Sequence, residues 1–563
     1  MKSVESTPKS PSQRAGSLPS PGHRRYRTAL AALCALPLLW SCNASEAQNG
    51  LGAGLVGAQP IPRVHLFENH SSALLAWRDA GVRDRVVVHL DGHADFDWLP
   101  DETIARLAAS ETRRLGEFEV HPYAMDDRAL AGFSIWNFIY PAVRLGLVRE
   151  LIWVVPDGTL PDDAAARELV RQRLVYKMQM ISLEEAQKLR IANGVIRGTL
   201  LGTPIYICEL DDLPAIDEPV LLDIDADYFT TRSALSQQVS DFPSTDPLET
   251  LIALRDRGIE SDLVTLSLST IGGYMPTASR WIGGTLKRHL RAPGRIDPDQ
   301  ERRRFEAIQS AEAGDHEQAS QQLRALVEEV PRDAALWYLL SRALDGLGET
   351  DAAAEARERA VAIDPMLDHD TLFDADRLWI NKQFAPALEL YDAYMERMPD
   401  GPFQAYVQRR RASCLERVGR ARDALHAWQQ VLELAPRHAD SHLDFALLLR
   451  ELGMADQAVA HMQIAREILP ERVTFAQALG STYVLQGRLE EGVRELRTAV
   501  RRQPCMPRIH GNLSAALVRL GRHQEAAEHL RLAMWLQPEN KQYRTLASQL
   551  DRQGIRVTPV AGP

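Results

Sequence analysis

The sequence predicts two architectures in one chain: an α/β domain with a parallel sheet over residues 60–290 and an all-α solenoid over residues 298–554. Short apolar runs alternate with helix-length segments in the first region, which is typical of a parallel sheet covered by helices. Prolines recur at a regular step in the second region. An apolar run near the start sets residues 1–50 apart as a leader.

The leader resembles a bacterial export signal. Basic residues at 23–27 precede an apolar run at 28–40, which is too short for a comfortable membrane span. The run ends in Leu39-Trp-Ser-Cys42, which resembles a lipobox and makes Cys42 the candidate lipidation site. An ordinary cleaved signal or an uncleaved anchor is the alternative. We therefore expect an exported cell-envelope protein, either a lipoprotein with a membrane anchor at its N-terminus or a periplasmic protein.

The composition excludes some partners and sites. The formal net charge of −11 offers no basic field for a nucleic acid, so nucleic acid is not expected as a partner. The five cysteines lack CxxC spacing, which argues against a thiolate zinc site and a disulfide framework. A metal would therefore have to be held by histidines and carboxylates.

The C-terminal half is repetitive. Prolines stand at positions 331, 365, 399, 436, 470, 504 and 538, a step of 34 residues that lengthens once to 37. Glycines at 314, 348, 419, 453, 487 and 521 keep the same register, and Lys382 takes the glycine position in the irregular unit. Each unit reads as a helix, a glycine turn, a second helix and a terminating proline.

This pattern resembles the tetratricopeptide repeat. It predicts about seven repeats and a terminal helix at 539–554. Stacked helix pairs form a concave groove, so we expect a peptide or protein partner there. A structural spacer or assembly platform is the alternative.

In the first region, apolar runs at 63–67, 85–91, 151–156, 204–210, 219–225 and 263–269 predict the strands. Two runs end in acidic clusters, Asp91-Gly-His93-Ala-Asp95 and Asp223-Ile-Asp225-Ala-Asp227. If the extended backbone persists, alternate side chains point the same way and converge at one sheet edge, where cations would relieve their repulsion. Helix capping is the alternative, but it explains one aspartate per helix and not three.

The two acidic motifs together resemble the arginase and ureohydrolase superfamily. Further segments make the likeness closest to the divergent branch that includes the peptide arginases: Glu68-Asn-His70, 89–96, 137–156, 223–229 and 272–276. The resemblance implies a three-layer α/β fold and two divalent metal ions, most readily Mn²⁺. It implies that Asp91 and Asp223 bridge the ions, that His70 and Asp95 complete one site, and that His93 and Asp225 complete the other.

The resemblance also implies a reaction. A hydroxide held by the metals and oriented by Asp95, the candidate catalytic residue, would convert an arginine side chain into ornithine plus urea, or cleave a related C–N bond. The solenoid would recruit the peptide or protein substrate. The rival function is a non-catalytic scaffold or binding protein of the cell envelope that uses the solenoid.

Four more residues have open roles. His89 is a ligand, a partner of a ligating carboxylate or a packed histidine, and Asp97 and Asp227 either support the site or are solvated. His121 is an acid or base, or an incidental loop histidine. The Asp-x-Asp pair also resembles phosphotransferases of the haloacid dehalogenase type, which do not explain Asp91, His93 and Asp95.

Overall fold

The computed structural model describes residues 53–125, 132–160, 182–192, 195–231, 238–240 and 242–557. The expected signal and Cys42 lie outside the described residues. In the part of the chain that is described, no helix combines the length and the apolar character of a membrane span.

The N-terminal domain is built on one mixed sheet, in the order β1-β9-β8-β3-β4-β7-β6-β5, with β2 beside β1 along the edge of β9. Its strands are β1 (Gly54–Leu55), β2 (Arg63–Phe67), β3 (Arg85–Leu90), β4 (Val148–Val154), β5 (Arg190–Ala192), β6 (Val195–Leu200), β7 (Thr203–Cys208), β8 (Val220–Asp225) and β9 (Glu260–Ser267).

The prediction of a parallel sheet is right for the centre and wrong for the edges. Strands β2, β9, β8, β3, β4 and β7 are mutually parallel, and they coincide with the six apolar runs. Strands β1, β5 and β6 pair antiparallel and were not expected. The connection from β6 to β7 is a tight turn at Leu201 and Gly202, which can only return the chain antiparallel.

Helices pack on both faces of the sheet. One face, with Val88 and Leu222, packs against α7 (Pro247–Asp256) and α8 (Trp281–Arg291). The other face, with Val87 and Leu221, packs against α2 (Ser72–Asp79), α3 (Asp101–Ala109) and α4 (Ile139–Arg144). Helix α6 (Leu183–Lys188) lies at the β6 end of the sheet. Alternating buried side chains thus send odd-numbered residues of β3 and β8 toward α2 and α4.

The C-terminal half consists of consecutive helix pairs. They are α9 (Pro298–Glu312) and α10 (His316–Glu329), α11 (Ala334–Gly346) and α12 (Thr350–Ile363), α13 (Asp370–Ile380) and α14 (Phe384–Arg397), α15 (Gln404–Arg417) and α16 (Ala421–Leu434), α17 (Ala439–Glu451) and α18 (Ala455–Ile468), α19 (Val473–Leu485) and α20 (Leu489–Arg502), α21 (Pro507–Arg519) and α22 (His523–Leu536), and then α23 (Lys541–Asp551).

The turn inside each pair explains the glycine register. The six glycines have φ between 72° and 80°, a left-handed conformation that favours glycine. In the irregular pair α13–α14, Lys382 adopts the same conformation with φ 61°. The helix geometry therefore requires this turn even where the sequence does not supply glycine.

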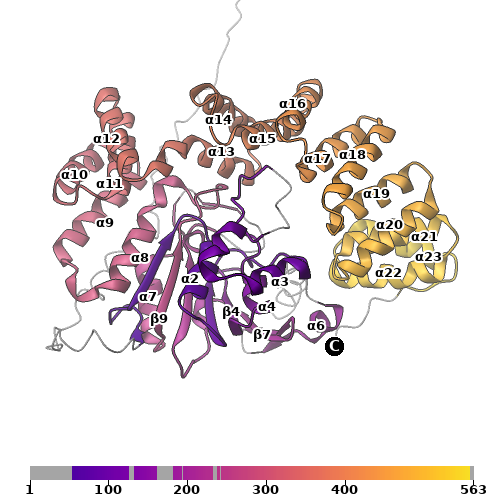
Figure 1. The fold of residues 1–563 in the computed structure, drawn as a ribbon, viewed down its shortest axis with the longest axis horizontal. Coiled ribbons are helices and arrows are strands. Elements are labelled where there is room, and N and C mark those ends of the chain that lie inside the picture. Colours follow the sequence, from indigo (N-terminus) through magenta and orange to yellow (C-terminus); the bar gives the residue numbers. More distant parts are fainter. Residues whose placement is uncertain are drawn as a thin grey trace, which may run out of the picture.

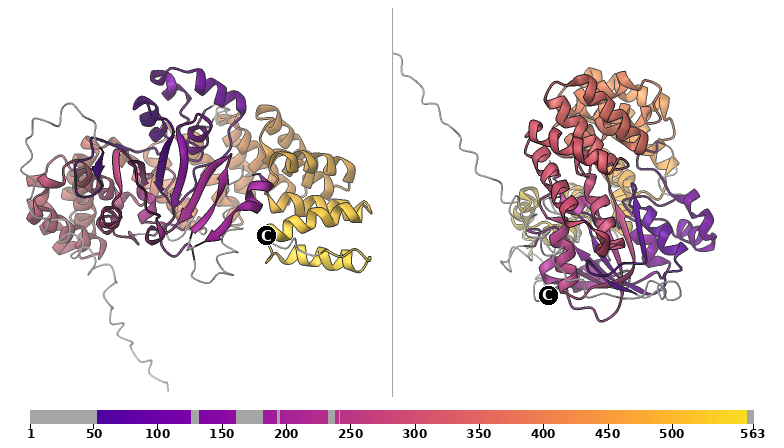
Figure 2. Two further views of the ribbon diagram at one scale, coloured as in Figure 1. Left: turned by 90° about the horizontal axis from the view of Figure 1, so that it is seen from below. Right: turned by 90° about the vertical axis from the view of Figure 1, so that its left-hand side faces the viewer.

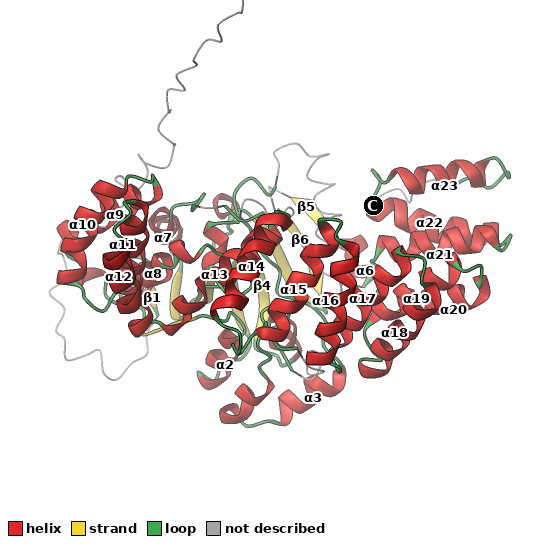
Figure 3. Cartoon of the chain, turned by 90° about the horizontal axis from the view of Figure 1, so that it is seen from above, coloured by secondary structure: helices red, strands yellow, loops and turns green. Residues whose placement is uncertain are grey.

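The solenoid arches over the sheet domain (Figure 1). Helices α9–α12 share a hydrophobic cluster with α7 and α8, the middle of the arch packs Leu372 and Tyr406 against Tyr123 and Ile271, and Cys505 near the far end joins the cluster of α2–α4. Two further views show the sheet under the arch (Figure 2), and α13–α16 pass above its strands (Figure 3). The three contacts fix the solenoid to the domain that carries the acidic motifs.

Candidate metal centre

Three neighbouring strands contribute one polar side chain each to the same face of the sheet. The register aligns His89 of β3 with Asp223 of β8, and Asp223 with Thr265 of β9. All three are fully buried. His89 Nδ1 lies 2.8 Å from Asp223 Oδ2, and the Thr265 hydroxyl donates to Asp223 Oδ1 at 2.5 Å.

The acidic motifs converge through turns and not through continued strands. Strand β3 ends at Leu90, and Asp95 has a left-handed φ of 46°. After β8, a 3-10 helix at Ala226–Phe229 begins with the Asp225 carboxylate accepting from the Asp227 backbone N–H. Gly92 allows the two turns to meet, because a Cβ there would lie 2.7 Å from Thr231 Oγ1. The expected convergence therefore occurs, but by a different backbone path.

His70, in the turn between β2 and α2, lies at the centre of the cluster. Its Nε2 is 2.8 Å from Asp223 Oδ2. Its Nδ1 lies 2.9 Å from Asp225 Oδ2, 3.1 Å from Asp95 Oδ2 and 3.2 Å from Asp91 Oδ2. A neutral His70 that donates from Nε2 to Asp223 turns the lone pair of Nδ1 toward three carboxylates. That is the arrangement by which a carboxylate orients a metal-ligating histidine.

A second group adjoins the first through Asp91. His93 Nδ1 lies 2.8 Å from Asp227 Oδ2 and 3.6 Å from Asp91 Oδ1. Ligand atoms of Asp91, His93 and Asp227 lie within 4.8 Å of one another, as do those of His70, Asp91, Asp95 and Asp225. Asp91 belongs to both groups, so it is the carboxylate that could contribute ligand atoms to both.

Asp223 and Asp225 differ from the roles that the resemblance implies, and Asp227, whose role was open, lies beside His93. Both oxygens of Asp223 are engaged, Oδ1 by Thr265 and Oδ2 by His70 and His89. The ligand atoms of Asp223 lie close to those of His70 and His89, but Asp223 does not form such a group with Asp91. Asp225, the last residue of β8, and Asp227, in the 3-10 helix that follows, face the other ligands instead, because they lie at the carboxyl end of the strand and Asp223 lies further inside the ladder.

Burial and mutual charge perturb the whole cluster. Burial, together with Asp91, raises the pKa of Asp95 to about 7, and burial, together with Asp225 and Asp91, raises the pKa of Asp227 to about 8. Burial opposes charge on His70 and His93, but the facing aspartates outweigh it and raise both pKa values well above the usual range. Without cations, protons alone relieve the repulsion.

Buried polar atoms without a hydrogen bond indicate whether cations would fit the cluster. His70 Nδ1, His89 Nε2, Asp91 Oδ2 and His93 Nε2 are buried and accept or donate no hydrogen bond. Unsatisfied buried polar atoms are costly, and four of them in one cluster fit a site whose missing partners are metal ions. Oxygen donors with some imidazole suit Mn²⁺ or Mg²⁺ better than a metal that prefers thiolate.

The loop after β9 supports this cluster. The Ser269 hydroxyl donates to Asp225 Oδ2 at 2.6 Å. The Tyr274 ring meets the His93 ring edge-on at 4.9 Å between centroids, and its hydroxyl accepts from Trp136 Nε1 at 3.0 Å. Within the cluster, His93 and Asp95 are the least buried, with side chains 17% and 9% exposed. The cluster therefore opens beside His93 and Asp95.

Residues of the solenoid also contact the loop after β9. Asp376 of α13 accepts hydrogen bonds from Tyr123 at 2.6 Å, from Tyr391 at 2.6 Å and from Tyr406 at 3.1 Å. The Tyr123 oxygen accepts in turn from the Gly272 backbone N–H at 2.8 Å. A Cβ on Gly273 would lie 2.2 Å from the Arg377 backbone nitrogen. We call Asp376 with Tyr123, Tyr391 and Tyr406 the tyrosine joint.

Arg280 forms a second link between the halves. Its guanidinium donates to Glu68, two residues before His70, and to Thr270 in the loop after β9. It also pairs with Asp364 at the end of α12 at 2.5 Å. The solenoid thus contacts the flanks of both His70 and the loop near His93.

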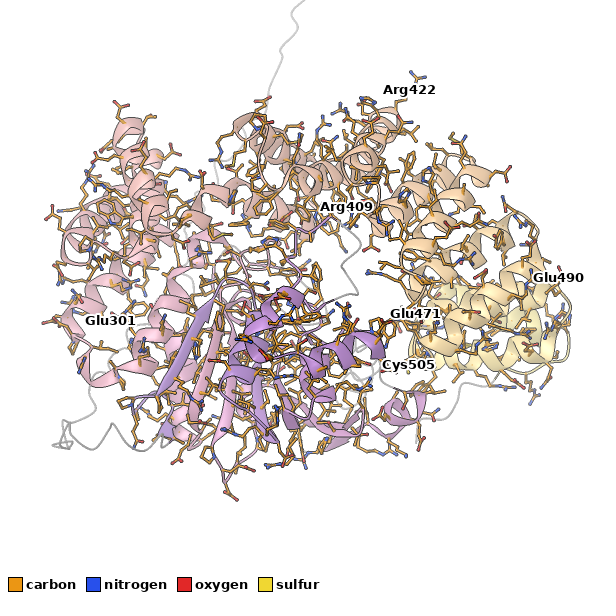
Figure 4. All side chains as sticks on the ribbon, viewed as in Figure 1. Glu301, Arg409, Arg422, Glu471, Glu490 and Cys505 are labelled. Carbon is orange, nitrogen blue, oxygen red and sulfur yellow. The ribbon has the colours of Figure 1, made fainter. Side chains whose placement is uncertain are left out.

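A cavity of about 530 Å³ lies between the sheet domain and the inner side of the arch. Asp97, His121 and Trp136 line it from the domain, and Arg409 and Glu471 line it from the solenoid (Figure 4). The His/Asp cluster does not line it, but Trp136, which lines the cavity, binds Tyr274, whose ring contacts His93. Asp97 and His121 accordingly lie outside the cluster.

Comparisons identify the repeats. The tetratricopeptide repeat family model matches residues 310–366, 409–472 and 478–538, so the solenoid contains tetratricopeptide repeats. No curated protein is detectably similar to the chain.

Solved structures similar to parts of the chain include MamA from Desulfovibrio magneticus RS-1, with 20% identity over 30% of this chain and 95% of that chain and a TM-score of 0.28. Another crystal structure of MamA has 14% identity over 29% and 95% and a TM-score of 0.26. YrrB, described as a TPR protein with an unusual peptide-binding site, has 14% identity over 40% and 98% and a TM-score of 0.24.

Sequence reasoning missed the supporting residues. Ser269 and Thr270 follow β9, the third neighbouring strand, so the rule that found the acidic strand ends also points to them. Tyr123, Arg280 and Asp376 carry no such signal, because their partners belong to the other half of the chain.

Proposed function

We propose that the N-terminal domain is a binuclear metal-dependent hydrolase of the ureohydrolase type, which cleaves a guanidino group or a related C–N bond of a substrate recruited by the repeats. The observation that carries the proposal is the buried cluster itself: two histidines and four aspartates facing one another with unsatisfied ligand atoms. Repulsion among buried carboxylates destabilises a packed core, whereas two bound metal ions would compensate these charges.

The ligand assignment follows the geometry. His70, Asp91, Asp95 and Asp225 would hold one ion, and Asp91, His93 and Asp227 would hold the other. Asp223 would orient His70 and His89 and bind neither ion. When bound, the ions would activate water and stabilise negative charge on the group under attack.

The protein side chains have separable tasks. Asp95, at the open side of the cluster, would accept and pass on a proton at its Oδ oxygens. Tyr274 and Trp136 would line the approach from the cavity to His93, because Trp136 lines the cavity and binds the hydroxyl of Tyr274, whose ring contacts His93. The cavity under the arch would admit the substrate, since it is bounded by both halves of the chain.

Metal content and product formation test the proposal together. The purified chain is expected to bind about two Mn²⁺ and to release urea or ammonia from a panel of guanidino, amidine and amide compounds. Asp91→Asn should lose both metal and product, whereas Asp84→Asn, on the surface before β3, should keep both. A wild-type chain without bound metal, or Asp91→Asn with normal metal content, would overturn it.

A second candidate is a scaffold that binds proteins without catalysis. The match of the repeats to the tetratricopeptide family favours it, because such repeats form interaction surfaces. Metal binding without product from any compound of the panel would support this candidate.

A further inference from the structure

The inner helices of three successive repeats line a second hollow, which we call the α17–α21 groove. Its volume is about 460 Å³, and it is separate from the cavity under the arch, with which it shares Thr474 alone. Its lining residues are Leu443, Leu447, Arg450, Thr474, Gln477, Ala478, Ser481, Val484, Leu485, Arg508, Asn512 and Ala515. No acidic residue is among them.

Two arginines in the groove are uncompensated. Among the described residues, neither Arg450 nor Arg508 forms an ion pair, and their hydrogen bonds go to neutral groups. Arg450 Nη1 donates to Thr482 Oγ1 at 3.5 Å, and the Gln477 side-chain oxygen, in its bonded orientation, accepts from Arg508 Nε at 2.7 Å. Burial lowers the pKa of Arg450, the charge of Glu451 outside the groove lining opposes this, and the charge of Arg508 lowers the pKa further.

Some arginines of the same repeats do have carboxylate partners. Arg466 pairs with Glu495, and Arg497 pairs with Glu525. In the groove, Arg450 and Arg508 lie close enough to repel each other, and no acidic side chain of the lining pairs with either of them. A bound anion would remove the repulsion.

The same groove exposes apolar surface. Leu485 is 70% exposed, and Leu443, Leu447 and Val484 are only partly buried. An exposed leucine beside uncompensated arginines defines the chemistry of a partner: an apolar side chain next to a carboxylate.

We propose that the α17–α21 groove binds a segment of a partner protein in which aspartate or glutamate adjoins a leucine-like side chain, with Arg450 and Arg508 receiving the carboxylate and Leu485 covering the apolar group. This inference rests on the proposed recruiting role of the solenoid and names its partner. It does not depend on the metal centre.

Fluorescence anisotropy of the full chain with labelled peptides tests the proposal. The probes are 12-residue peptides of Leu, Ala and Glu in which the Glu position moves one residue at a time, with a matched Gln set. We expect a Glu peptide to bind about tenfold or more tightly than its Gln counterpart, and this preference to fall at high salt. No binding, or equal binding of both sets, overturns the proposal.

Variants locate the binding. Arg450→Glu and Arg508→Glu should each weaken the best Glu peptide about tenfold or more, and the double variant should prefer the Lys counterpart. Arg422→Glu is the matched control, because Arg422 is exposed on the outer side of the arch (Figure 4). Peptide binding unchanged in the groove variants overturns the proposal.

Folding and the metal centre are monitored separately. Thermal unfolding and Mn²⁺ content should be unchanged in Arg450→Gln and Arg508→Gln, which remove the charge with little change of size. Loss of peptide binding with metal retained supports the groove, whereas loss of metal in the wild-type chain concerns the proposed hydrolase alone.

Discussion

The solenoid and the candidate metal centre are organised over different distances in the sequence. In the solenoid, a glycine turn and its two helices lie within one repeat, and each repeat packs mainly on its neighbours. In the candidate metal centre, His70 contacts Asp223 across 153 positions, and the loop after β9 contacts α13 at Arg377 and, through Tyr123, at Asp376. The comparison teaches that local rules suffice for the repeats, whereas the His/Asp cluster forms only when distant segments meet.

The largest effect is expected on metal binding, from substitution of Asp225 rather than of Asp223. Asp225→Asn should weaken Mn²⁺ binding by more than about 100-fold because Asp225 faces both His70 and Asp95. Asp223→Asn should cost about 10- to 100-fold, since it would disturb only the orientation of His70 and His89. Isothermal titration of the two variants measures the difference, and a larger loss in Asp223→Asn would restore the assignment that the resemblance implies.

The tyrosine joint tests whether the two regions are one folding unit. Asp376→Asn should lower the free energy of unfolding by about 2 kcal/mol, because it leaves the partly buried Arg410 without its carboxylate, 3.6 Å away, and weakens the hydrogen bonds of three buried tyrosines. Denaturant unfolding measures this loss. Asp351→Asn, at an exposed site on α12, is the control and should change little. Equal free energies of unfolding for the two variants would mean that the tyrosine joint does not contribute to stability.

Two pairs of histidines, two repeats apart, predict a pH dependence of the solenoid. His510 Nε2 lies 2.8 Å from the Pro504 carbonyl and its Nδ1 lies 3.1 Å from His529 Nδ1, and His442 and His461 repeat this geometry. The carbonyl only accepts, so Nε2 carries the proton and Nδ1 accepts from a neutral His529. Burial lowers the pKa of His510 to about 4.

Because the folded chain resists protonation of His510, stability should be fully present above pH 6.5 and fall as the pH drops from about 6.5 to about 4. The loss should be up to about 3 kcal/mol, at 1.36 kcal/mol per pKa unit. Thermal unfolding between pH 7 and pH 4 checks it. His510→Gln should flatten the profile, while His426→Gln, at an exposed position, should leave it unchanged.

The smallest effect is expected in the irregular repeat. Lys382→Gly should raise the free energy of unfolding by about 1 kcal/mol, because it relieves a left-handed lysine at φ 61°. Gly419→Ala, at the same place in the next repeat, should lower it by a similar amount. Denaturant midpoints measure both changes, and opposite signs are required.

The sequence was informative wherever neighbours decide the structure. The strands at 63–67 and 220–225 and the glycine turns could be read from local patterns, since alternation and turn chemistry act over a few residues. The edges of the sheet could not be read, because whether β6 pairs antiparallel depends on the β6–β7 turn and not on apolar content.

Part of the site could also be read. The structure brings His70, Asp91, His93, Asp95 and Asp225 into one cluster, but it places Asp225 beside His70 and not beside His93, and it places Asp223 beside His70 and His89 alone. His89, left open between three roles, proved to be a buried partner of Asp223.

The sequence by itself determined the repeat period, the buried strands and the presence of acidic groups at their ends, because these follow from side-chain type and spacing. The tertiary structure alone decided which carboxylates face one another, how the arch covers the cavity, and that α13 supports the loop beside His93. These features depend on contacts between residues far apart in the chain, and no local pattern encodes such contacts.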